Sequence, residues 1–184
     1  EPVWRGELPA GAAPPLLEPD AQAELSTYAA ARMATVASLV AEVRDAMAPS
    51  GVPLSFIDHA GGMAHVMAGT SADDEVTLSS RKLGIDVAAV ADACDEMCLL
   101  GYVDTPERLQ ALLASYERAL PAGTRRSVAL RPLLQDCHAP DNLAAKVAAV
   151  RASGAQDVSF YHYAMMPLGR LDWIRRSLGG QDAS

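Results

Sequence analysis

Two patterns of apolar positions take turns along the chain. In one, apolar residues recur at helical spacing; in the other, they form short continuous runs. Apolar residues recur at helical spacing from Leu25 to Val43, and the breaker PSG follows at 49–51. This predicts a long helix over 20–47. The next run, VPLSFIDHA at 52–60, is apolar until its last residues, which is typical of a buried parallel strand that ends at a functional site.

The same strand and helix pattern recurs three more times. Each strand is an apolar run, and each helix is bounded by caps or breakers, such as the Thr105-Pro106 pair that starts one of them. Strict alternation of helix and strand predicts an α/β fold with a parallel sheet. The predicted elements are strands at 96–102, 127–134 and 158–163, helices near 85–94 and over 106–120, 141–153 and 168–178, and a loop at 61–80.

Two architectures have this alternation: an open sheet with helices on both faces, and part of a (β/α)8 barrel. An open sheet of the first kind needs two apolar faces. Here one face of the predicted strands is apolar, and the other is small, polar or aromatic: Ser55, His59, Ala129, Arg131, Ser159, Tyr161 and Tyr163. This difference between the two faces of the strands therefore favours a half barrel of four β-α units.

Composition narrows the class of protein. The 184 residues suit one domain, and 50% hydrophobic residues argue against overall disorder. Residues 1–19 contain five prolines and no periodicity, so we predict an extended or flexible segment there and the α/β domain over 20–180. The net charge of −8, without a cluster of basic residues, argues against nucleic-acid binding, and no apolar run is long enough for a membrane helix.

Three cysteines, Cys94, Cys98 and Cys137, are an odd number without the paired spacing of a zinc site. Reduced thiols are expected, and a cytoplasmic location follows from that expectation. The glycine-containing loop after the first strand lacks the spacing of a nucleotide-binding motif. We therefore expect neither a cofactor nor a bound metal.

Three segments carry a resemblance: VPLSFIDHAGGMAHVM (52–67), LGIDVAAVADACDEMCLLGYVDTPERL (83–109) and the run from VALRPLLQDCHAP to DWIRRSL (128–178). They resemble the C-terminal half of alanine-rich actinobacterial proteins of uncharacterised activity, which are more distantly similar to glycoside hydrolases with TIM-barrel folds. The resemblance implies that the predicted strands are strands five to eight of a barrel. It also implies that the acid/base carboxylate such enzymes commonly carry on strand four lies outside this chain.

Barrel active sites lie at the carboxyl ends of the strands, so residues there are candidates for chemistry. Asp58, His59 and Asp136 are the candidate catalytic residues, because a glycosidase places two carboxyl groups across the scissile bond. The candidate substrate-binding residues could stack on a sugar or bind its polar groups: Tyr102, Arg131, Tyr161, His162 and Tyr163. The first hypothesis is thus a hydrolase-like barrel half that binds a carbohydrate or another polar small molecule.

These residues also have structural interpretations. Asp58 suits a helix cap or loop anchor equally well, and the tyrosines suit packing inside a barrel. Arg131 follows an apolar run and needs an anionic partner, which would be structural if it were Glu96 or Asp58.

Two alternative functions stay open. A metal-dependent hydrolase would use Asp58, His59 and His162, with His138 as a further ligand, although strand parity separates His59 from His162. A non-catalytic half barrel would instead pair with a missing N-terminal half or with a second copy, because an isolated half exposes two sheet edges.

Overall fold

The computed structural model describes residues 19–59 and 75–179. Helices and strands alternate in the order expected from the sequence, so the predicted α/β class and parallel sheet are confirmed. The strands are β1 (Ser55–Asp58), β2 (Glu96–Leu100), β3 (Arg126–Leu130) and β4 (Asp157–Phe160). The helices are α1 (Pro19–Met47), α3 (Glu75–Leu83), α4 (Val87–Ala93), α5 (Pro106–Ala119), α6 (Pro140–Ala152) and α7 (Gly169–Ser177), with single 3-10 turns η2 (Ala48–Ser50) and η3 (Tyr163–Met165).

The four strands lie side by side in the order β1-β2-β3-β4, and every pair is parallel. Strand order therefore follows chain order, and each strand pairs with the one before it. The register places Ile57 beside Cys98, and Cys98 beside Ser127. Register partners, and residues two positions along from them, consequently share a face across the sheet.

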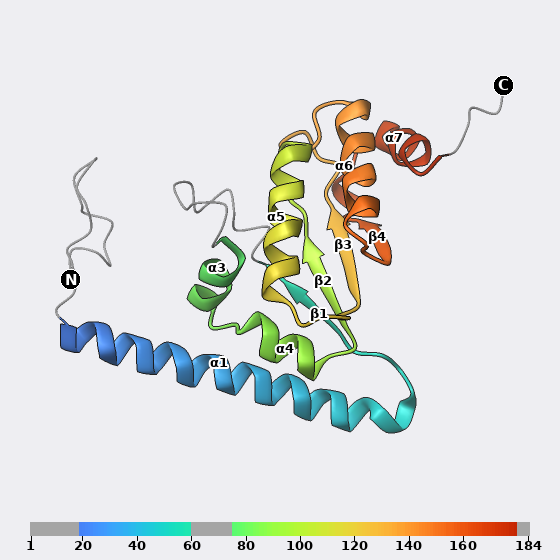
Figure 1. Cartoon of the computed structure of the whole chain (residues 1–184). Coiled ribbons are helices and arrows are strands. Elements are labelled where there is room, and N and C mark those ends of the chain that lie inside the picture. Colours follow the sequence, from blue (N-terminus) through green and yellow to red (C-terminus); the bar gives the residue numbers. More distant parts are fainter. Residues whose placement is uncertain (1–18, 60–74, 180–184) are drawn as a thin grey trace.

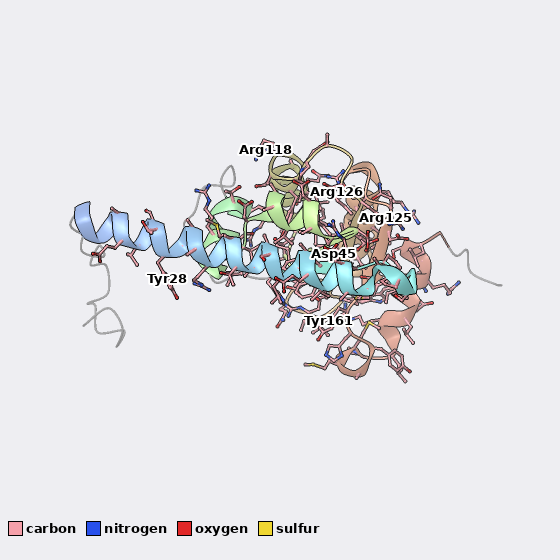
Figure 2. The ribbon with its side chains drawn as sticks, turned by 90° about the horizontal axis from the view of Figure 1, so that it is seen from below. Tyr28, Asp45, Arg118, Arg125, Arg126 and Tyr161 are labelled. Atoms are coloured by element: carbon pink, nitrogen blue, oxygen red, sulfur yellow. The ribbon has the colours of Figure 1, made fainter. Side chains whose placement is uncertain are left out.

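One face of the sheet packs against the helices and forms the main core. Met97, Leu99 and Val128 point into this layer, where they meet apolar side chains of the helices such as Leu109 and Leu143. Figure 2, which views the molecule from below, shows Tyr161 and Arg118 of α5 on opposite sides of it. The sequence predicted that Ala129 faces away from the helices. This is confirmed, because Ala129 belongs to a small cluster with Leu100 and Tyr102 that is separate from the main core.

The approach of α5 to the sheet depends on one glycine. Gly101 follows β2, and a Cβ there would lie 2.9 Å from Leu109 Cδ1 and 3.1 Å from Leu130 Cδ2. Thr105 begins α5 as predicted, because its hydroxyl accepts a hydrogen bond from the backbone N–H of Arg108. These two features place the start of α5 close to the carboxyl ends of β2 and β3.

Helix α1 lies across the end of the sheet from which the strands start (Figure 1). Two arginines attach it there: Arg32 donates to the carbonyl of Leu83 at 3.1 Å, and Arg44 donates to that of Asp92 at 2.8 Å. The predicted helix over 20–47 is confirmed. The segment predicted as extended or flexible lies, up to residue 18, outside the described residues.

Several boundaries differ from the sequence predictions. Part of the predicted loop at 61–80 is helical, since α3 begins at Glu75 and buries Val76 and Ser80, one turn apart, completely. Tertiary burial here overrides a polar local composition. All four strands are shorter than predicted, so Leu134 and Tyr163, for example, lie beyond the sheet rather than within it.

Candidate functional site

The face of the sheet away from the helices, here called the open face, forms a hollow of about 560 Å³. Its floor is apolar or small, and its rim at the carboxyl ends of the strands is polar and aromatic. The hollow is lined by Ile57, His59, Cys98, Leu100, Tyr102, Ala129, Ser159, Phe160 and Tyr161. This size is within the range of small-molecule sites.

An aromatic and cationic stack forms the rim. The guanidinium carbon of Arg131 lies 4.6 Å from the ring centroid of Tyr102. The Tyr102 ring in turn lies 6.1 Å from that of Tyr161, with 25° between the planes. Burial raises the pKa of Tyr102 to about 12, despite the opposing effect of Arg131. Tyr102 is therefore a neutral phenol at physiological pH, and Tyr161, 53% exposed, ends the stack toward solvent.

Arg131 is held in place by its own loop. Its Nε forms an ion pair with the Asp136 carboxylate, which is 1% exposed. Gln135, with its amide oxygen turned toward the guanidinium, accepts from the two terminal nitrogens at 3.2 and 2.7 Å. The prediction that Glu96 or Asp58 would be the anionic partner of Arg131 is wrong, because the partner is Asp136. This candidate catalytic carboxylate thus orients Arg131.

A buried lysine supports the same loop. Lys146 of α6 is 1% exposed, and its ammonium donates to the carbonyl of Val103 at 2.5 Å and to that of Asp136. Burial lowers the pKa of Lys146, although nearby Cys137 and Asp136 oppose this effect. The lysine joins the chain segments that follow β2 and β3. Sequence reasoning missed it, because a single lysine within a helix is usually on the surface.

The candidate catalytic residue Asp58 lies on the helix side of the sheet. Its carboxylate is completely buried, and it accepts hydrogen bonds from Tyr116 Oη at 2.5 Å and from Ser80 Oγ at 3.3 Å. It therefore joins β1 to α5 and α3. It does not line the hollow, and its placement matches the anchoring interpretation rather than that of a substrate-facing acid.

The other candidates lie at or beyond the rim. His59 lines the hollow next to Ile57. His162 lies beyond β4, which ends at Phe160, so the strand position from which its direction was predicted does not exist. Its ring meets that of Tyr161 edge-on at 4.5 Å. Tyr163 lies in η3 and is 67% exposed. The structure thus brings together His59, Tyr102, Arg131, Tyr161 and His162, and leaves Tyr163 outside the stack.

The opposite end of the open face carries an ionic cluster that the sequence gave no reason to group. Glu96 accepts from Ser127 Oγ at 2.6 Å and from Arg125 Nε at 2.9 Å. Arg125 also pairs with Asp157 at 2.9 Å. The hydrogen bond from Ser127, followed by that from Arg125, lowers the pKa of Glu96 below its ordinary 4.5.

We expect this cluster to contribute to acid stability. Because the folded pKa of Glu96 is lowered, the unfolded chain binds more protons just below pH 4.5, so the stabilisation is present above that pH and is lost as pH falls through the folded pKa. Urea unfolding between pH 3 and 7 should show that Glu96→Gln is less stable than wild type at neutral pH and that this gap narrows in acid. Glu117→Gln, on the exposed surface of α5, should show no such narrowing.

Within residues 19–59 and 75–179, no three His, Cys, Asp or Glu side chains gather as a metal site would require. His65, in the loop after β1, lies outside these ranges. All three cysteines are free thiols. In the same ranges, no helix combines the length and apolar character needed to cross a bilayer.

Comparison with known proteins does not place this chain in a family. No family model, curated protein or solved structure matches this chain. Function must therefore be inferred from the open face and its rim.

Proposed function

We propose that the open face is the inner wall of half a (β/α)8 barrel and that its rim binds the ring of a carbohydrate or a similar polar small molecule. Chain-order strands, helices packed on one face and a hollow on the other support the barrel half. The Arg131–Tyr102–Tyr161 stack at the carboxyl ends of the strands carries the binding proposal.

The chemistry of the rim favours a neutral ligand with one flat apolar face. Tyr161 offers an exposed ring, and Tyr102 offers a phenol that stays protonated. The positive charge of Arg131 is balanced by Asp136, so the guanidinium acts mainly by fixing the Tyr102 ring. A pyranose suits such a rim, because its C–H face packs on an aromatic ring while its hydroxyls bond to polar groups.

This half supports binding better than it supports catalysis. A glycosidase needs two carboxyl groups facing the sugar, about 5 to 9.5 Å apart. Asp58 faces the helices, and Asp136 is engaged by Arg131. In a hydrolase, the reacting carboxylates would then come from a complementary half, while the rim described here holds the substrate.

The proposal is tested by saturation-transfer NMR with methyl glucoside, methyl galactoside, methyl mannoside and N-acetylglucosamine. At least one should bind with a millimolar Kd, and Tyr161→Ala should weaken it about tenfold, about 1.4 kcal/mol. Tyr161→Phe, which keeps the ring, should bind like wild type. Tyr28→Ala removes an equally exposed tyrosine on α1 and should change nothing.

A second readout locates the ligand. Cys98 lines the hollow, whereas Cys137 is buried elsewhere. A bound pyranoside should slow alkylation of Cys98 by iodoacetamide in wild type and not in Tyr161→Ala. No binding by any of the four sugars, or equal losses in the Tyr161 and Tyr28 variants, would overturn the proposal.

A further inference from the structure

Among the described residues, the sheet has one face outside the main core and two unpaired edges. Helices pack on the face opposite the hollow. On the open face Ile57, in the edge strand β1, is 50% exposed, whereas Leu100 and Ala129 of the central strands are buried by their neighbours. Strands β1 and β4 each pair with one neighbour. Parallel sheets are normally covered on both faces, and unpaired edges are sites of association.

The size of the open face indicates what kind of structure covers it. Four strands spaced about 4.8 Å apart, with about 3.3 Å per residue along five residues, give a face of about 300 Å². A stable protein interface needs about 800 Å² on each partner. The projected face alone is smaller than such an interface, and an occupant that also pairs with β1 and β4 and adds helices beyond them would extend the contact; another set of parallel strands and helices would do this.

We propose that the occupant is a β/α half barrel of different sequence, with bulky apolar side chains opposite β3 and β4, rather than a second copy of this chain. This inference rests on the half barrel proposed above. It goes further by stating which partner can close the barrel.

Side-chain size decides against self-pairing. The interior of an eight-stranded barrel holds about twelve side chains, mostly bulky and branched. The open face supplies six to its middle: Ile57, Cys98, Leu100, Ser127, Ala129 and Ser159. In a twofold pair each strand faces its own copy across the barrel, so Ala129 would face Ala129, and Ser159 would face Ser159. The middle of the interior beside β3 and β4 would remain underfilled, although Tyr161 occupies space at the rim above it.

The charges on the open face also argue against pairing with a second copy. At the base of the open face, Arg125 serves both Glu96 and Asp157, so these three side chains carry a surplus negative charge. A second copy would double this surplus and add another −8 to the net charge. A partner that brings a cation to this end and large side chains to the middle is complementary in both respects.

The experiment replaces small side chains of the open face with larger ones. Ala129→Leu/Ser159→Leu enlarges the two inward positions, and the matched control Ala114→Leu/Ser38→Leu adds the same groups on exposed faces of α5 and α1. Each variant is mixed with wild type at about 0.1 mM in about 0.5 M salt, where charge repulsion is screened beyond about 5 Å. Native mass spectrometry and sedimentation report pairing, and alkylation of Cys98 reports whether the hollow is covered.

We expect wild type alone to remain monomeric. The enlarged variant should form a 1:1 pair with wild type at least tenfold more tightly than wild type pairs with itself, and it should protect Cys98. The control mixture should stay unpaired. Circular dichroism verifies folding, and Ser159→Leu alone, at an exposed edge position, serves if the double variant unfolds.

The two ways of failing are distinguishable. A tight wild-type dimer with Cys98 protected would overturn the requirement for a different partner and leave the half barrel standing. Absence of pairing in every mixture, with Cys98 equally reactive throughout, would overturn barrel closure itself. Neither result depends on sugar binding, which the Tyr161 variants test separately.

Discussion

Asp58→Ala is expected to lower the free energy of unfolding by about 3 kcal/mol, which corresponds to a fall in Tm of about 10 °C for a chain of this size. The carboxylate is completely buried and accepts from the hydroxyls of Tyr116 and Ser80. Its removal leaves both hydroxyls without this acceptor in an apolar layer and opens a gap between β1 and two helices. Urea unfolding followed by circular dichroism measures the change.

Two variants separate anchoring from catalysis. Tyr116→Phe removes one of the two hydroxyls and should cost about half as much, whereas His59→Ala, at the neighbouring exposed position, should stay within about 0.5 kcal/mol of wild type. If Asp58→Ala unfolds like wild type yet no longer binds the sugar that wild type binds, Asp58 is a ligand-facing acid and its assignment as an anchor is wrong.

Arg131→Ala is the second variant with a large expected effect, a loss of about 3 kcal/mol. The guanidinium neutralises the buried Asp136 carboxylate, and breaking a buried pair from one side costs far more than removing both partners. Arg131→Ala/Asp136→Ala should accordingly be more stable than the sum of the single variants predicts, with a coupling of about 2 kcal/mol by urea unfolding.

The arginine also fixes the Tyr102 ring, so its loss should appear in the binding assay. Arg131→Lys keeps the charge and loses the planar fork, and it should recover stability better than sugar binding. A coupling near zero, or full rescue of both properties by lysine, would contradict the proposed role.

Much of the fold was predictable because the strands are short apolar runs between strong helix signals. Thr105 marked the start of α5, and parity placed Ser159 and Tyr161 away from the helices. The limits of β3 and β4 were less predictable. Both strands stop where the chain turns to form the rim, and the residues past that point, RPLL at 131–134 and YHY at 161–163, look like strand in the sequence.

The site was predictable in position and less so in the roles of its residues. Asp58 was expected at a strand end, but its partner Tyr116 is 58 residues away, and no local pattern connects them. Arg131 and Asp136 are only five residues apart, so their pairing had a local signal that the search for more distant carboxylates passed over. Lys146 had none, since its burial depends on how α6 docks.

The chain-order arrangement of the strands bears on how the protein is made. Each new strand pairs with the strand synthesised just before it, so a growing chain can extend its sheet at one edge as each unit leaves the ribosome. Among the described residues, β1 and β4 still have only one neighbour each in the complete sheet, so both edges are open to other chains during and after synthesis. If the barrel is closed by the complementary half proposed above, synthesis of the two halves in step would give those edges a correct neighbour before an incorrect one arrives.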